Sequence, residues 1–150
     1  MKKEEEMLNS FLVSVFNDIL RLEEESIAQS GVSDLSVSEL HVLEQIEKLS
    51  GDEQKVGMGK LASALNVTGG TLSIAIKTLE QKGYVKRQKD SKDKRRVYLA
   101  LEDGAYAPLC AHNAFHTQLV AHACEKLDDE QLQSLSQALA SLHALFTKGT

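Results

Sequence analysis

Two short amphipathic segments joined by a tight polar turn constrain the fold of this chain more than any other feature. Residues 57–65 have helical apolar spacing, and Asn66 is a typical helix end. Thr68 is placed to cap a second helix, over residues 69–82, which Gly83 stops. This pattern predicts a helix-turn-helix. The positions expected to form its shared core are Leu61, Leu65, Val67, Leu72, Ile76 and Leu79.

The hydrophobic period changes after Gly83. Residues 84–88 form a strand candidate, residues 89–94 a polar turn, and residues 96–101 a second strand. In the second strand, Val97, Leu99 and Leu101 fall on one side. A helix-turn-helix followed by a basic hairpin predicts a winged helix.

Charge is distributed unevenly along the chain. Residues 55–96 carry 11 Lys or Arg against 3 Asp or Glu, a local charge of +8. The other 108 residues carry 6 against 19, or −13, which together give the net charge of −5. A basic block at a helix-turn-helix is typical of a surface that binds a polyanion. Charge alone leaves open the alternative of a solvated hairpin.

The flanking segments predict long helices. A first helix is expected over residues 4–29, and Ser36 with Glu39 forms a capping-box pattern before a helix that ends near residue 49. Two more helices are expected between residues 102 and 148, separated at 127–130, where Asp128 caps the second. The last helix has a long apolar stripe, which predicts an intermolecular helical bundle. The stripe consists of Leu132, Leu135, Leu139, Leu142, Leu145 and Phe146.

The fold class predicted is mainly α (α+β), with one domain over residues 1–150. Within it, residues 35–101 form the winged helix-turn-helix, with the wing at 84–101. Residues 1–34 and 102–150 form a helical dimerisation region.

Cys110 and Cys124 are expected to be reduced and buried. Both lie on one helical segment, too far apart to form a disulfide bond with each other.

Several classes of protein receive no support from the sequence. No apolar run approaches the roughly 20 residues needed to span a membrane. No secretory signal is visible at the N-terminus, so a cytoplasmic protein is expected. No nucleophile elbow, phosphate loop or zinc-protease motif is present, so no enzyme is predicted.

The second short helix has the shape required to enter the major groove of DNA. Its hydroxyl and lysine side chains can contact phosphates or base edges, and glycines at its start allow a phosphate to approach the helix N-terminus. Thr68 also has the simpler role of N-cap. The residues predicted to contact DNA here are Thr68, Gly69, Thr71, Ser73, Ile74, Lys77 and Thr78.

The hairpin tip carries the second predicted DNA contact. Asp93 is expected to hold the guanidinium of Arg95 and direct it into a narrow minor groove. A solvated turn is the alternative. The residues expected to follow phosphates along the backbone are Lys89, Lys92, Lys94 and Arg96.

From residue 9 to residue 146 the chain resembles MarR-family transcriptional regulators. The resemblance rests on residues 35–43, 61–68 and 79–85, with the wing signature at 93–97. It implies a two-fold homodimer built from the first, fifth and sixth helices, whose two winged domains bind a pseudo-palindromic double-stranded operator. It also implies that Arg95 is the minor-groove residue and Asp93 its orienter.

Within the family, the chain is most similar to the fatty-acid-biosynthesis repressors of Gram-positive bacteria, through residues 11–12, 16–20, 22–27, 39–41 and 115–116. That similarity implies repression with acyl-carrier protein as corepressor, its acyl chain entering a pocket above the DNA-binding domains. The chain departs from the usual family pattern at Glu102, Ala105 and Pro108, and the proline predicts a delayed or kinked fifth helix.

A metal site is a competing interpretation. His112 and His116 are four residues apart on one helical face, which suits chelation. Glu24, His41, His112 and His116 resemble the zinc ligands of zinc-uptake repressors in the family. The alternative is that these histidines line the effector pocket. A protein-binding winged helix that does not contact DNA is a third hypothesis, which the basic block opposes.

Overall fold

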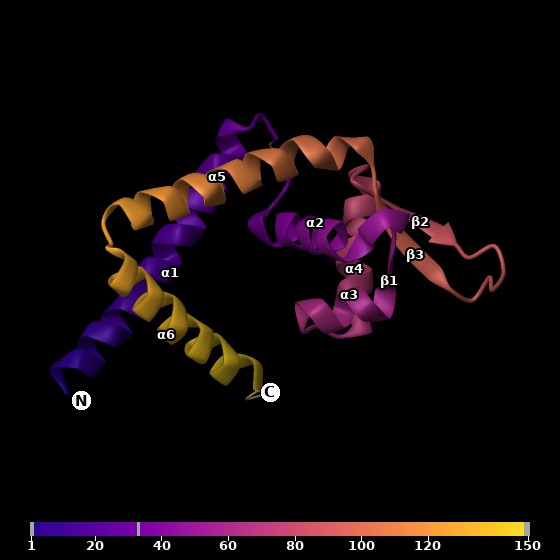
Figure 1. Ribbon diagram of the computed structural model, residues 1–150. Helices are drawn as coiled ribbons and strands as arrows, with labels where there is room; N and C mark the ends of the chain where they lie inside the picture. The colour runs from indigo at the N-terminus through magenta and orange to yellow at the C-terminus, as the bar shows by residue number, and fades with distance from the viewer. Residues whose placement is uncertain (1, 33, 149–150) are drawn as a thin grey trace. The chain divides into compact units, whose positions relative to one another are not determined.

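The computed structural model describes residues 2–32 and 34–148 and divides into two compact units, Met1–Asn113 and Ala114–Thr150. Among the described residues, no helix is long and apolar enough to cross a membrane. The predicted division into a winged helix with flanking dimerisation helices stays a prediction. The elements, drawn in Figure 1, are α1 (Lys3–Gln29), α2 (Val37–Ser50), η1 (Gly51–Glu53), β1 (Val56–Gly57), α3 (Met58–Leu65), α4 (Gly69–Gln81), β2 (Val85–Lys89), β3 (Val97–Leu101), η2 (Asp103–Ala105), α5 (Tyr106–Glu125) and α6 (Asp129–Lys148).

The predicted helix-turn-helix is formed by α3 and α4. Asn66 ends α3 in the left-handed conformation, with φ of 53°. The Thr68 hydroxyl starts α4 by accepting a hydrogen bond from the Thr71 amide at 3.2 Å. Val67 is 38% exposed, so its assignment to the core was wrong. It lies in the turn between the two helices, where only part of its side chain can be covered.

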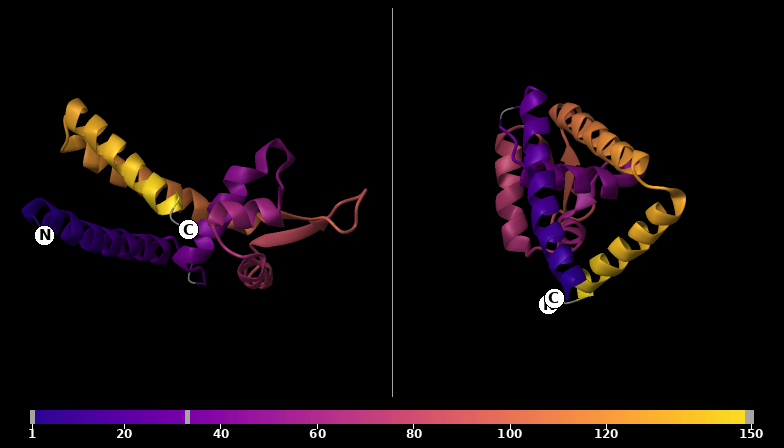
Figure 2. Two further views of the ribbon diagram at one scale, coloured as in Figure 1. Left: turned by 90° about the horizontal axis from the view of Figure 1, so that it is seen from below. Right: turned by 90° about the vertical axis from the view of Figure 1, so that its left-hand side faces the viewer.

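A three-stranded antiparallel sheet completes the first unit, with strand order β1-β3-β2. The predicted hairpin pairs Val85 with Leu101 at its base and Lys89 with Val97 at its far end. Figure 2 shows the loop between β2 and β3 extending beyond the neighbouring helices of this unit. Strand β1 was not predicted, because its two residues are too short to show a period.

The core of the first unit joins the sheet to α2, α3, α4 and the start of α5. The capping box predicted at the start of α2 is present, since the Ser36 hydroxyl accepts from the Glu39 amide and the Glu39 carboxylate accepts from the Ser36 amide. This cap fixes where α2 begins and therefore which of its residues face the core. The largest fully buried side chains are Leu40, Leu43, Ile46, Leu61, Leu72, Ile76, Leu79, Leu99 and Leu109.

Helix α5 begins in the first unit and continues into the second. Pro108 is its third residue and is buried, so it occupies the first turn, where a helix amide has no intrahelical acceptor. The helix therefore begins before the proline rather than after it. In the second unit, α6 starts as predicted, because the Asp128 carboxylate accepts from the Gln131 amide at 2.8 Å.

Both cysteines are free thiols on α5, as expected, but they are not buried. Cys110 is exposed and Cys124 is partly exposed. The prediction of buried thiols was wrong because it rested on the general tendency of free cysteines to be buried, and among the described residues no other element fully covers either side chain.

Candidate nucleic-acid interface and effector site

Helix α4 has one buried face and one exposed face. Leu72, Ile76 and Leu79 pack into the core. The opposite face carries exposed residues three or four apart, which places them in one stripe along the helix. The predicted contacts Ser73 and Thr78 are half-buried at its edges. The exposed stripe consists of Gly70, Thr71, Ile74, Lys77 and Gln81.

Gln81 was missed in the sequence, although its spacing of seven residues from Ile74 is a detectable signal. Its side-chain amide is exposed at the last turn of α4. Glutamine is a residue that can pair with adenine in a major groove through two hydrogen bonds. It therefore belongs with the candidate contacts on this helix.

Helix α4 begins with two successive glycines, although the fold has room for a larger side chain at both positions. A Cβ placed on Gly69 meets no atom within 4 Å, and one placed on Gly70 meets only the Thr68 hydroxyl oxygen at 4.0 Å. Glycine in a helix is less favourable than alanine by roughly 0.5–1 kcal/mol. The open space in front of these glycines suits a group from another molecule, and the helix N-terminus favours an anion.

The wing tip, residues 90–96, is ordered by its two aspartates. The Asp90 carboxylate accepts from the Lys92 amide, and the Asp93 carboxylate accepts from the Arg95 amide, each at 3.0 Å. The amide of Arg96 donates to the carbonyl of Asp93. In both cases an aspartate side chain accepts from the backbone amide two residues ahead. This arrangement is an Asx turn, and it fixes the backbone of the loop.

The way in which Asp93 was expected to orient Arg95 is therefore corrected. Asp93 bonds the backbone amide of Arg95, and no ion pair joins it to the guanidinium among the described residues. An aspartate side chain is short, so the amide two residues ahead is nearer than the end of a long arginine. Asp93 positions Arg95 through the loop backbone and leaves the guanidinium exposed.

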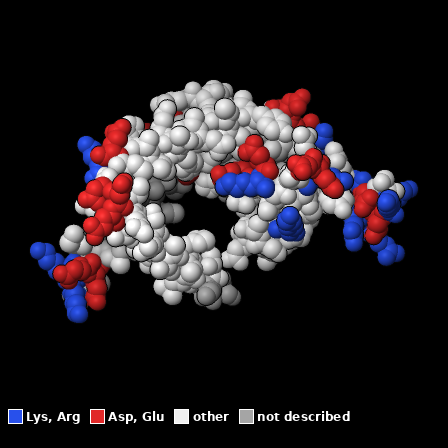
Figure 3. Space-filling model, viewed as in Figure 1, with Lys and Arg blue, Asp and Glu red and all other residues white. Residues whose placement is uncertain are grey.

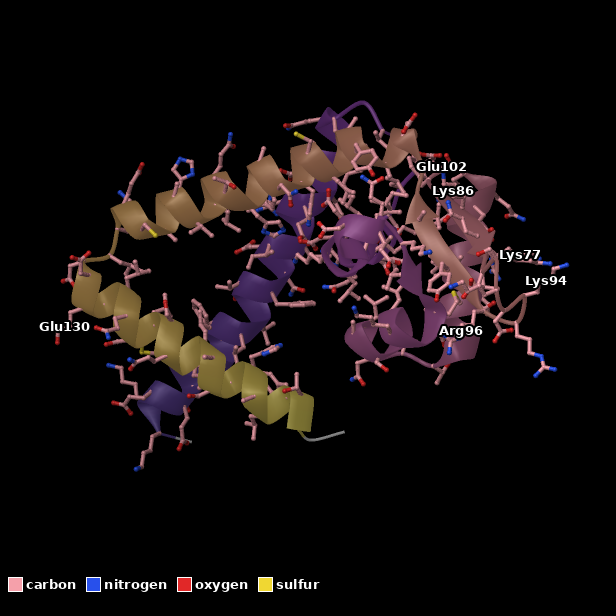
Figure 4. The ribbon with its side chains drawn as sticks, turned by 45° about the vertical axis from the view of Figure 1, so that its right-hand side comes forward. Lys77, Lys86, Lys94, Arg96, Glu102 and Glu130 are labelled. Carbon is pink, nitrogen blue, oxygen red and sulfur yellow. The ribbon has the colours of Figure 1, made fainter. Side chains whose placement is uncertain are left out.

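Positive charge gathers at the hairpin end, as Figure 3 shows for one face. Figure 4 shows Lys77 on α4 and Lys94 and Arg96 on the wing, and all three are exposed. Every predicted contact of the wing is exposed on the surface. These residues are Lys89, Lys92, Asp93, Lys94, Arg95 and Arg96.

Two ion pairs fix α4 relative to its neighbours. Arg87 on β2 bonds Glu80 on α4 at 2.9 Å, which joins the wing to this helix. The Lys82 ammonium at the end of α4 donates to both carboxylate oxygens of Glu39 on α2, at 2.8 and 2.9 Å. Lys82 also donates to the carbonyl of Asp34, whose carboxylate accepts from the Tyr84 hydroxyl at 2.6 Å. Glu39 therefore both caps α2 and holds the end of α4.

The environment of this cluster shifts two pKa values. Partial burial alone would raise the pKa of Glu39, but the hydrogen bonds from Lys82 and the Ser36 amide outweigh it and lower that pKa below 4.5. Burial, with the hydrogen bond to Asp34, raises the pKa of Tyr84 to about 12. At neutral pH Glu39 is charged and Tyr84 is a neutral donor.

Replacing Glu39 with glutamine should lower the free energy of unfolding by about 1 kcal/mol or less, since the ion pair is only partly buried. Replacing it with alanine should cost roughly 1 kcal/mol more, because the cap is also lost. A lowered carboxyl pKa stabilises the fold above the unfolded value near 4.5 and loses that effect as pH falls through the folded value. Urea unfolding near pH 7 and below pH 4.5 should show the difference between wild type and Glu39→Gln shrinking. An equal difference at both pH values would contradict the role of the charge.

A cluster of titratable side chains lies between α1, α2 and the start of α5, within the first unit. Glu23, His41 and His112 bring one ligand atom each to within 4.8 Å of one another. Glu23 Oε1 lies 3.2 Å from His41 Nε2, and the rings of His41 and His112 are 5.5 Å apart. Glu23 and His112 are buried. Carboxylate and imidazole are ligand types that zinc accepts.

The described cluster differs from the predicted metal set at two residues, because it contains Glu23 in place of Glu24 and does not include His116. Glu24 is exposed and lines a different cavity, with Val32 and Leu35, whereas the buried carboxylate beside His41 is that of Glu23. Successive helical residues differ by about 100° around the axis, so adjacent glutamates cannot face the same site. His116 belongs to the second unit, where its ring contacts Phe115.

Glu44 on α2 extends the cluster. Its carboxylate lies 3.7 Å from His112 Nε2 and 2.9 Å from the Lys48 ammonium. Partial burial would raise the pKa of Glu44, but the hydrogen bond from Lys48 and the nearby histidines lower it. A carboxylate beside a ligand-type histidine can orient the imidazole ring.

An apolar cavity of about 320 Å³ opens beside Glu23 and His41. Its walls come from α1 and α2, and its polar groups are confined to Glu23, Ser38 and His41. The volume is at the small end of the roughly 300–1,000 Å³ typical of small-molecule sites. The site thus combines apolar walls with a polar end. The apolar side chains in the lining are Phe16, Ile19, Leu20 and Val37.

The α3–α4 motif, the three-stranded sheet and the extended basic hairpin define a winged helix-turn-helix protein. The sequence profile of the MarR family matches residues 35–97. A MarR-family domain is therefore present over these residues, and the predicted resemblance to MarR-family regulators and the predicted fold class are confirmed.

Solved structures with this fold include FabT of Streptococcus pneumoniae in complex with DNA, at 26% identity and a TM-score of 0.86 over 97% of this chain and 99% of that chain. AbsC, a MarR family transcriptional regulator of Streptomyces coelicolor, has 20% identity and a TM-score of 0.77 over 100% and 98%. MepR of S. aureus bound to DNA has 20% identity and a TM-score of 0.73 over 90% and 96%. No curated protein sequence matches the chain.

Proposed function

We propose that the chain is a homodimeric repressor that inserts α4 into a major groove and the wing tip into a minor groove of a pseudo-palindromic operator. The observation that carries this proposal is the exposed basic wing beside the exposed stripe of α4, in a chain that is otherwise acidic. FabT and MepR, which share the fold, were solved bound to DNA. The proposed contacts are Thr68, Gly69, Thr71, Ser73, Ile74, Lys77, Thr78, Lys89, Lys92, Asp93, Lys94, Arg95 and Arg96, with Asp93 acting through the loop backbone.

Exposed apolar side chains on the long helices support a dimer. Helix α1 exposes Leu8, Phe11 and Phe16. Helix α6 exposes Leu139, Leu145 and Phe146. Monomeric proteins rarely leave extended apolar helix faces in water. A second copy of the chain is the proposed cover for both sets.

Lys89→Ala should weaken binding to all duplexes and flatten the salt dependence, because each phosphate contact contributes about one released counterion. The affinity for a fixed duplex is measured over a series of salt concentrations. The slope of log affinity against log salt concentration should fall in magnitude by roughly 1 for each Lys89 side chain that contacts a phosphate. Lys3→Ala, on α1 and outside the winged helix, is the matched control and should leave the slope unchanged. An unaltered slope for Lys89→Ala would remove this residue from the phosphate contacts.

The proposed effector is a long acyl chain, carried by acyl-carrier protein and regulating fatty-acid-type genes. The sequence similarity to fatty-acid-biosynthesis repressors supports it, and so does the apolar cavity between α1 and α2. Apolar walls suit a hydrocarbon chain, and a polar end suits its head group. The direct test is an operator titration with long-chain acyl-carrier protein, with zinc, or with neither.

Zinc is the second candidate effector, and the close approach of Glu23, His41 and His112 favours it. Three protein ligands leave one position of a zinc tetrahedron for water or a further side chain. Glu23 and His41 also line the apolar cavity proposed for the acyl chain, so zinc and the acyl chain would compete for the same residues. In either case the signal would reach the DNA-binding surface through α2.

Glu23→Gln should weaken zinc binding by on the order of tenfold or more, because the buried carboxylate is lost from the ligand set. Glu24→Gln, one residue along and exposed, is the matched control and should bind zinc like the wild type. Zinc titration of the purified proteins against a competing chelator measures both. Equal losses in the two variants, or no zinc binding by the wild type, would exclude this metal site and favour the acyl chain.

A further inference from the structure

Ile74 is the most exposed large apolar side chain of the winged helix. It is 72% exposed at the centre of the outward face of α4, between Gly70 and Lys77. Isoleucine is among the residues most often buried, and its stiff branched side chain loses little freedom on contact. A group of this kind in the middle of a polar stripe is placed to make one apolar contact with another molecule.

The hydroxyl groups next to Ile74 are bonded within the helix. The Thr78 hydroxyl donates to the Ile74 carbonyl at 3.2 Å, so its proton is already used. The Thr71 hydroxyl pairs with that of Thr68 at 3.0 Å. Lys77 extends outward from α4 (Figure 4), and a lysine of this length suits contact with a phosphate. Ile74 is therefore the side chain that extends from the middle of the stripe without a bond to its own helix.

We propose that Ile74 is a specificity-determining residue that contacts the 5-methyl group of a thymine in the major groove. This inference rests on the proposed DNA-binding function and adds the base that the helix selects. Thymine is the only DNA base with a methyl group in this groove, and apolar side chains recognise it by contact. A protein partner would need a wider apolar patch, whereas the neighbours of Ile74 on the stripe are glycine, threonine and lysine.

The experiment starts from duplexes selected out of a randomised pool by the full-length protein. Each thymine of the best duplex is replaced in turn by deoxyuridine, which lacks only the methyl group. With the wild type, one replacement in each half-site should lower affinity by about fourfold, the effect of exposing one methyl group. Ile74→Ala changes both protomers, so on the thymine duplex it should lose about fourfold in each half-site, roughly sixteenfold in total, and it should become insensitive to that one replacement. Ile74→Val should retain the sensitivity.

The outcomes separate this inference from the function on which it rests. If no duplex is selected, the DNA-binding proposal fails and the inference fails with it. If a duplex is selected and its binding depends on Lys89, but deoxyuridine has no effect with the wild type, only the thymine contact is overturned. Sensitivity that persists in Ile74→Ala would also overturn it, by assigning the methyl contact to another residue.

Discussion

Arg95→Ala is expected to weaken operator binding by roughly tenfold or more, since a guanidinium placed in a narrow minor groove makes one of the stronger contacts of such an interface. The Arg95 side chain is exposed at the wing tip, and its backbone is held by the Asp93 carboxylate. Removing the side chain therefore leaves the loop hydrogen bonds in place. Fluorescence anisotropy with a labelled operator duplex at one fixed salt concentration measures the change.

Arg95→Lys is the informative control for that result. It keeps the charge but replaces the planar guanidinium by a compact ammonium. The salt dependence should stay near the wild-type slope, while the preference for the selected operator over unrelated duplexes should fall. If the Arg95→Ala variant bound the operator with wild-type affinity, the wing tip would be a solvent-exposed turn without a DNA contact, and the proposed minor-groove contact would be contradicted.

Ile76→Ala should lower the free energy of unfolding by about 2–5 kcal/mol, the usual cost of removing a buried aliphatic side chain. Ile76 is 0% exposed and packs with Leu72 and Leu79 in the shared core of the helix-turn-helix. Ile74→Ala, two residues away on the same helix, should change stability by less than about 0.5 kcal/mol, because Ile74 is in solvent.

Urea unfolding of both variants at one protein concentration tests this pair. The two substitutions remove the same atoms from the same helix, so they differ only in which face they occupy. Similar midpoints would show that α4 is rotated from the orientation described. That result would also withdraw the exposed stripe from the proposed DNA contacts.

The secondary structure of the winged helix could be predicted because local chemistry determines it. Asn66 and Thr68 mark the turn, and Ser36 with Glu39 marks the start of α2. The strands follow from alternating residues after Gly83. By contrast, β1 depends on pairing with β3, a contact between distant residues that no local pattern reveals.

The candidate sites were predictable in residue type more than in geometry. The basic hairpin tip is visible in sequence, but the bond from Asp93 to a backbone amide depends on the loop conformation. Likewise, three successive glutamates lie near the end of α1, and only the packing of α1 on α2 distinguishes Glu23 from Glu24. The ion pair between Glu39 and Lys82 joins residues 43 positions apart and has no sequence signature.

Selection from a randomised duplex pool, followed by titration of the selected duplex, tests the central proposal most directly. The full-length protein should enrich two half-sites related by a two-fold axis, and affinity should fall steeply as salt rises. Combined substitution of Lys92, Lys94 and Arg95 by alanine should abolish the enrichment while the protein stays folded. A protein that enriches no sequence, or a triple variant that enriches the same half-sites with equal affinity, would contradict DNA recognition by α4 and the wing.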